Sequence, residues 1–199
     1  MREFIIYSNK GVTTSDFHIK DLPGSGGRMD LMARSIISAL WLSHDMRRNT
    51  KIHINLNGEP DPPITITFNG KTLRKASPNE REIGIWIKKA LKRKKDLKNG
   101  EWLETHSGIQ ISRKSFEDLI EERRNKDIYI LKEDGEDIRK KDVKEDSVYI
   151  LGDNIGLPER ITEYLNDLEA QKISLGPKSY FTTQSIILIQ NELDRKKVG

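Results

Sequence analysis

The hydrophobic and polar positions of this chain recur with the two periods that separate strands from helices. Alternating or continuous apolar runs predict strands, and apolar residues three and four positions apart predict helices. The predicted strands span residues 3–8, 51–56, 64–68, 127–131, 147–151 and 171–175, and the predicted helices span residues 28–43, 116–124, 158–168 and 182–197. Because strands and helices alternate, we expect an α/β fold with a mainly parallel sheet.

Turn and cap signals add further elements. Asn69-Gly70 predicts a hairpin that joins residues 64–68 to residues 71–73. Ser77 followed by Glu80 predicts a helix cap with a proline at the first helical position, and this helix runs into a lysine-rich segment. Residues 9–27 are polar and end in a glycine cluster, which predicts an irregular loop.

Length and composition narrow the class of protein. The 199 residues predict a single domain, residues 1–199. The absence of cysteine excludes a disulfide scaffold, a zinc-thiolate site and thiol catalysis, and the four histidines lack a metal-binding spacing, so we expect no metal. No apolar run reaches the roughly 18 residues of a membrane span, and the first residues turn polar too early for a signal peptide. We therefore expect a soluble cytoplasmic protein.

Positive charge is concentrated in one segment. Residues 86–98 hold seven lysines or arginines and one acid, whereas the whole chain has a net charge of only +4. One or two cations would suit the end of a helix, where they complement the macrodipole. Seven favour contact with a polyanion such as a nucleic acid backbone.

Three predicted strands end in polar turns that contain glycine. In open α/β sheets, ligands bind outside the carboxyl ends of the strands, where glycine lets main-chain groups come close. Leu131, Gly152 and residues 174–176 are therefore candidate walls of one pocket, although glycines that serve only to turn the chain would give the same pattern. The common phosphate-binding glycine motifs are absent.

Three charged residues are candidates for chemistry. Arg28 follows the glycine cluster at a helix start, where a cation is disfavoured, so gripping an anion explains it best. Asp30 is either a helix-start acid or a functional carboxylate. Asp61 lies between two prolines, as either a turn former or a positioned base.

These segments together resemble a known family. The sequences PGSGGRMDL at 23–31, LSHDMRR at 42–48, PDPP at 60–63, SLGPKS at 174–179 and NELDR at 191–195 look like those of TrmY, the archaeal SPOUT-class tRNA pseudouridine-54 N1-methyltransferases. The resemblance covers essentially the whole chain, and the separated motifs occur in the family's order.

The resemblance implies a fold, a cofactor and a partner. It implies an α/β SPOUT fold whose C-terminal part, about residues 127–199, is tied in a trefoil knot, and it implies a homodimer. The knot loops would bind S-adenosylmethionine through Leu131, Gly152, Ser174, Leu175, Gly176, Tyr180 and Ser185. Family members often have cysteine where this chain has Ser185, and we expect the serine to keep a polar contact.

The resemblance also implies the reaction, N1-methylation of pseudouridine 54 in the tRNA T-arm. In this mechanism Asp61 or Asp30 accepts the N1 proton, while Arg28 holds a phosphate or the uracil carbonyl. The expected RNA contacts are Arg28, Arg47, Arg48, Lys88, Lys92, Arg93 and Lys95. Two alternatives stay open: N1-methylation of an rRNA pseudouridine by the same fold, and a non-catalytic RNA-binding module.

Overall fold

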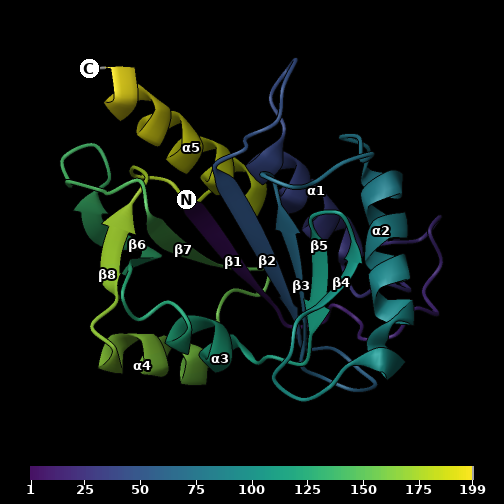
Figure 1. The fold of residues 1–199 in the computed structure, drawn as a ribbon. Coiled ribbons are helices and arrows are strands. Elements are labelled where there is room, and N and C mark those ends of the chain that lie inside the picture. Colours follow the sequence, from purple (N-terminus) through teal and green to yellow (C-terminus); the bar gives the residue numbers. More distant parts are fainter. Residues whose placement is uncertain (199) are drawn as a thin grey trace.

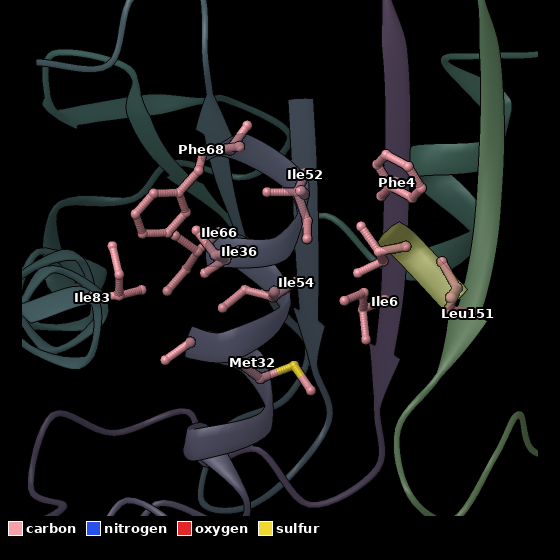
Figure 2. Close-up of a cluster of buried hydrophobic side chains, with 14 of the residues drawn as sticks. Phe4, Ile6, Met32, Ile36, Ile52, Ile54, Ile66, Phe68, Ile83 and Leu151 are labelled. Carbon is pink, nitrogen blue, oxygen red and sulfur yellow. The ribbon is translucent and has the colours of Figure 1, made fainter. Parts of the chain in front are cut away.

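Strand β1 (Arg2–Ser8) shows how the chain builds its core. All seven residues are buried, and successive side chains point to opposite faces of the sheet. Phe4 and Ile6 join one hydrophobic cluster, and Ile5 and Tyr7 join the other. The sheet is therefore covered on both faces, as Figure 1 shows. Figure 2 shows side chains of the larger of the two clusters.

The computed structural model describes residues 1–198, so Gly199, the last residue of the expected domain, lies outside the described residues. The remaining strands are β2 (Thr50–Leu56), β3 (Ile64–Asn69), β4 (Leu103–His106), β5 (Ile109–Ser112), β6 (Asp127–Asp137), β7 (Ser147–Gly152) and β8 (Gln171–Ser174). The helices are α1 (Met29–Leu40), α2 (Glu80–Lys92), the short 3-10 helix η1 (Lys94–Asp96), α3 (Phe116–Glu121), α4 (Glu159–Asp167) and α5 (Thr182–Val198). Helices α1, α2 and α5 cover one face of the sheet, and α3 and α4 cover the other.

The sheet has the order β4-β5-β3-β2-β1-β7-β6-β8. Strands β2, β1, β7, β6 and β8 are parallel, which confirms the α/β expectation for this half. Strands β3, β5 and β4 pair antiparallel, and the hairpin of β4 and β5 was not predicted. The carboxyl ends of the parallel strands therefore meet along one edge of the sheet.

The hairpin predicted at Asn69-Gly70 is wrong. Strand β3 ends at Asn69, and its second neighbour is β5 rather than residues 71–73. A Cβ on Gly70 would lie 2.1 Å from the Arg47 carbonyl oxygen, so this glycine serves a close approach between two loops. Glycine is therefore needed at position 70, but for this close packing and not for a hairpin turn.

The predicted cap of α2 is two residues too early. Asn79 is the N-cap, and its side chain accepts a hydrogen bond from the Glu82 amide at 3.1 Å. Ser77 bonds instead to the Glu82 carboxylate, with its amide donating at 3.1 Å. By contrast, Ser115 forms the predicted cap of α3, as a complete capping box.

A buried cluster of charged and polar groups lies between the β1–β2 pair and the segment that follows α3. The Glu3 carboxylate accepts from Arg123 at 2.7 Å and from Lys126 at 2.9 Å, and it lies 2.9 Å from His53 Nε2. Burial opposes ionisation of Glu3, but contacts with His53, Arg123 and Lys126 outweigh it and hold the pKa of this carboxyl far below its usual range. Burial, together with Arg123, lowers the pKa of His53 to about 4.

This cluster makes the fold sensitive to acid. The unfolded chain protonates His53 near its ordinary pKa of 6.5, whereas the folded chain resists protonation until about pH 4. Between these values the unfolded state holds more protons, so stability falls as pH falls, by about 1.4 kcal/mol per pH unit for one proton. Urea unfolding between pH 7 and pH 4 measures this slope, and we expect His53→Gln to flatten it. An unchanged slope in that variant would contradict the assignment.

Candidate active site

The carboxyl ends of β7 and β8 and the middle of β6, which continues to Asp137 rather than ending at Leu131 as predicted, surround a cavity of about 360 Å³. All seven residues expected to contact a cofactor line it: Leu131, Gly152, Ser174, Leu175, Gly176, Tyr180 and Ser185. The structure therefore brings together positions that lie up to 54 residues apart in sequence. Apolar side chains and a few hydroxyl groups line the same space, which is the usual composition of a small-molecule site.

Glycine is required at two places in this wall. A Cβ on Gly152 would lie 2.5 Å from the Gly156 carbonyl carbon, so two turns of backbone meet there without side chains between them. Gly176 has φ = 129°, a conformation that other residues rarely adopt. Thr182 at the start of α5 donates to the Gly152 carbonyl oxygen at 2.8 Å and joins that helix to the strand end.

A second cavity, of about 640 Å³, adjoins the first. Asp153, Tyr180 and Thr182 line both, so the two spaces share a wall. Its other lining residues are Arg28, Leu31, Arg34, Asn154, Phe181 and Thr183. The Phe181 side chain is 76% exposed, and the second cavity is thus open to a large ligand.

Arg28 reaches this second cavity from the N-cap of α1. Its backbone is left-handed, with φ = 71°, and it follows Gly27, whose Cα packs against the Lys10 carbonyl group. The Arg28 guanidinium donates to both oxygens of Asp30, from Nε at 3.0 Å and from Nη2 at 3.2 Å. This hydrogen bonding to Asp30 raises the pKa of Arg28, and the charge of Asp153 adds to the effect. An arginine that stays charged and fixed suits the binding of an anionic or carbonyl oxygen.

Asp30 is buried and held by two arginines. Arg34 Nη2 donates to Asp30 Oδ2 at 2.5 Å, the same oxygen that accepts from Arg28 Nη2. Burial alone would raise the pKa of Asp30, but Arg28 and Arg34 outweigh it and lower the pKa. Both oxygens are thus engaged in orienting Arg28.

Asp61 lies away from both cavities, on the loop after β2. Its carboxylate accepts from Arg113 at 2.9 Å and lies 3.3 Å from Lys94 Nζ. Hydrogen bonds from Arg113 and Lys94 lower its pKa. Among the described residues, neither cavity includes Asp61 in its lining.

The residue that the sequence patterns missed is Asp153, directly after Gly152. Its side chain is buried, and its carboxylate accepts from the Asn9 amide at 2.6 Å, the Asn9 side chain at 2.9 Å and the Ile155 amide at 2.9 Å. The sequence feature that could have pointed to Asp153 is an acidic residue directly after a glycine at the end of a buried strand.

The expected RNA-binding residues fall into two groups. Arg47 is bound to Asp194 on α5, at 2.6 Å, and Arg48 donates to the carbonyl oxygens of Gly70 and Leu73, so both have contacts within the fold. Lys92, Arg93 and Lys95 are exposed around the end of α2, whereas Lys88 donates to the Phe17 carbonyl oxygen at 2.7 Å. An ion pair between Lys94 and Asp61 joins this basic end of α2 to the loop after β2. That loop lies at the same end of the parallel strands as the two cavities.

The described residues contain neither a cluster of metal-ligating side chains nor a membrane-spanning helix. In the part of the chain from 1 to 198, no group of three or more His, Asp or Glu residues is arranged to hold a metal ion. No helix among the same residues has the length and apolarity needed to cross a membrane.

Comparison with known proteins identifies the family to which the chain belongs. Residues 1–198 match the family described as "Putative SAM-dependent RNA methyltransferase", and the chain belongs to this family, whose methyl donor is S-adenosylmethionine. It is 42% identical to the tRNA (pseudouridine(54)-N(1))-methyltransferase of Methanocaldococcus jannaschii, over 100% of this chain and 98% of the relative. It is 46% identical to the protein of the same name from Methanococcus maripaludis strain C7, over 99% and 100%. The family resemblance predicted from the motifs is thereby confirmed.

A solved structure shares the fold. Archaeoglobus fulgidus Nep1 bound to S-adenosylhomocysteine superposes with a TM-score of 0.60 and covers 100% of this chain and 98% of that chain. At 14% sequence identity this likeness concerns the fold alone.

Proposed function

We propose that this protein transfers the methyl group of S-adenosylmethionine to N1 of pseudouridine 54 in tRNA. One observation carries the proposal: the three strand segments expected to bind the cofactor surround a single cavity, and this cavity shares a wall with the space that Arg28 faces. Full-length similarity to enzymes with this name supports the choice of substrate.

The first cavity suits the cofactor in size and lining. Its volume of about 360 Å³ lies within the usual range for ligand sites, roughly 300–1,000 Å³. Leu131, Leu175 and Ile173 supply apolar walls, while Ser174, Thr182 and Ser185 supply hydroxyl groups. When bound, the cofactor supplies an electrophilic methyl group on a sulfonium. Ser185, where relatives often have cysteine, is buried in this wall and offers a polar contact.

The second cavity would receive the target base. In-line methyl transfer requires N1 to be aligned with the methyl group, and a fixed cavity lowers the entropic cost of that alignment. Arg28 would hold a phosphate or a uracil carbonyl oxygen. Asp30 acts through Arg28, because both of its oxygens bind arginines. The base must leave its stack to reach this cavity.

We also propose that the C-terminal part is knotted. Ile173 of β8 is the register partner of both Leu131 and Glu136 of β6, and a strand residue has one neighbour on each edge. The chain between these two positions would therefore cross from one edge of β8 to the other. Gly135 supports this crossing, because a Cβ there would lie 2.6 Å from the Ile173 backbone.

A homodimer remains a proposal from the resemblance. Exposed apolar side chains support it: Ile155, Phe181 and Ile187 are more than half exposed near the second cavity and on α5. A second copy that covers these residues would also close the open side of the site. We also propose a cytoplasmic location, which a tRNA substrate supports.

The substrate assignment is tested with matched RNA hairpins. The protein and S-adenosylmethionine are incubated with a T-arm hairpin that carries pseudouridine at position 54, with the same hairpin carrying uridine, and with a pseudouridine-containing fragment of small-subunit rRNA. We expect methylation of the first RNA alone. Methylation of the rRNA fragment alone would favour the rRNA alternative, and cofactor binding without methylation of any RNA would favour a binding module.

Gly152→Val should weaken cofactor binding by about 100-fold. The valine side chain would displace the backbone of Gly156 and Leu157 on the cavity wall, and a shift of about 1 Å in such a wall costs about 100-fold. Calorimetry with S-adenosylmethionine measures the loss. The control is Gly100→Ala, which has a positive φ and open space around its Cα, far from the cavity. Wild-type affinity in Gly152→Val would contradict this placement of the cofactor.

The basic end of α2 should contribute to RNA affinity through charge. Lys92 and Lys95 are exposed, so we expect the double alanine variant to weaken tRNA binding and to lower the slope of log affinity against log salt by about 2. Fluorescence anisotropy over a salt series gives this slope. The exposed Lys140 provides the control substitution. An unchanged slope in the double variant would exclude this segment from the RNA interface.

A further inference from the structure

Asp153 occupies the wall between the two cavities. Among the described residues it is the only acid that lines both, since Glu133 lines the first cavity alone. It follows Gly152 at the end of β7 and lies opposite the α1 N-terminus that carries Arg28. A group at this junction is placed where a methyl group must pass from cofactor to base.

Its hydrogen bonds differ from those of the other two candidate carboxylates. Asp30 binds Arg28 and Arg34, and Asp61 binds Arg113 and Lys94, so each is neutralised by two cations. Asp153 accepts from main-chain amides and one asparagine side chain, and within residues 1–198 it forms no salt bridge with a lysine or arginine.

Asn9 fixes the orientation of this carboxylate. The amide N–H and the side-chain Nδ2 of Asn9 donate to different oxygens of Asp153, and Nδ2 also donates to the Gly156 carbonyl oxygen at 2.9 Å. The ends of β1 and β7 thus hold Asp153 rigidly. Oδ1 accepts from both Asn9 Nδ2 and the Ile155 amide, whereas Oδ2 accepts only from the Asn9 amide, so Oδ2 has a further lone pair that could accept a proton.

We propose that Asp153 is the general base that accepts the N1 proton of the target base, in place of Asp61 or Asp30. This inference rests on the proposed function. In the step, the N1–H bond breaks and the proton passes to a carboxylate oxygen of Asp153. The electron pair remains on N1, which takes the methyl group, and the sulfonium becomes a neutral thioether. As the methyl group bonds to N1, the N1 proton becomes strongly acidic, so a carboxylate is a sufficient base.

The first test compares three variants in single-turnover methylation of the pseudouridine hairpin. We expect Asp153→Asn to lower the rate by about 10²- to 10⁴-fold, with the affinities for S-adenosylmethionine and for RNA close to wild type. Asp167→Asn, an exposed acid on α4, serves as the control. Asp61→Asn tests the competing base: a loss there, with a wild-type rate in Asp153→Asn, would overturn the inference.

Two further measurements separate a base from a structural role. In Asp153→Gly, added formate should restore part of the rate, because it can replace the missing carboxylate at the junction. Without S-adenosylmethionine, wild-type protein should speed solvent exchange of the N1 imino proton in the bound hairpin, as seen by NMR, and Asp153→Asn should not. No rescue together with equal exchange would assign Asp153 a structural role. If wild-type protein methylates no RNA, it is the proposed function that fails.

Discussion

Arg28→Ala is expected to lower kcat/KM for the pseudouridine hairpin by about 10²- to 10³-fold, the usual cost of removing one preorganised donor to a developing charge. The guanidinium is fixed by Asp30 and faces the second cavity, so alanine removes the only cation there besides Arg34 in the described part of the chain. Arg28→Lys should recover little, because a lysine cannot make the two-pronged contact with Asp30.

Steady-state kinetics with saturating S-adenosylmethionine measures this effect. Arg81→Ala is a matched control, since Arg81 is exposed on α2 and lines neither cavity. Cofactor affinity should stay unchanged in Arg28→Ala, because Arg28 does not line the first cavity. A wild-type rate in Arg28→Ala would show that Arg28 does not contribute to the reaction.

Glu3→Gln should lower the free energy of unfolding by about 3–5 kcal/mol, the usual cost of breaking a buried ion pair. The Glu3 side chain is 5% exposed, and its loss of charge would leave Arg123 and Lys126 without their shared partner. The Arg123 side chain is 9% exposed and would keep Glu122, at 3.2 Å, as its ionic partner.

Urea unfolding at pH 7 measures the change. The control is Glu163→Gln on the exposed side of α4, for which we expect a change within about 0.5 kcal/mol. A loss below 1 kcal/mol in Glu3→Gln would show that the ion pair does not stabilise the fold.

The convergence of three strand segments on one cavity could be predicted from the sequence, for a physical reason. Parallel strands buried on both faces read as continuous apolar runs, and their carboxyl ends must meet at one edge. Leu131, Gly152 and Gly176 therefore converge as expected. The same reasoning placed Arg28 near a ligand, because a cation at a helix start needs a partner.

Other features depend on contacts that no local pattern records. The antiparallel strands β4 and β5 are four residues each, too short for a clear period. Asn69-Gly70 looked like a hairpin because close packing against Arg47 also selects glycine. Asp61 looked like a positioned base, but Arg113, 52 residues later, binds its carboxylate. The importance of Asp153 depends on Asn9, 144 residues away.

The most direct measurement is a crystal structure of the protein with S-adenosylhomocysteine. We expect the ligand between Leu131, Gly152 and Gly176, with its sulfur facing the cavity that Arg28 and Asp153 line. Density only at another surface, or none at saturating ligand, would contradict the placement of the methyl donor and with it the proposed reaction.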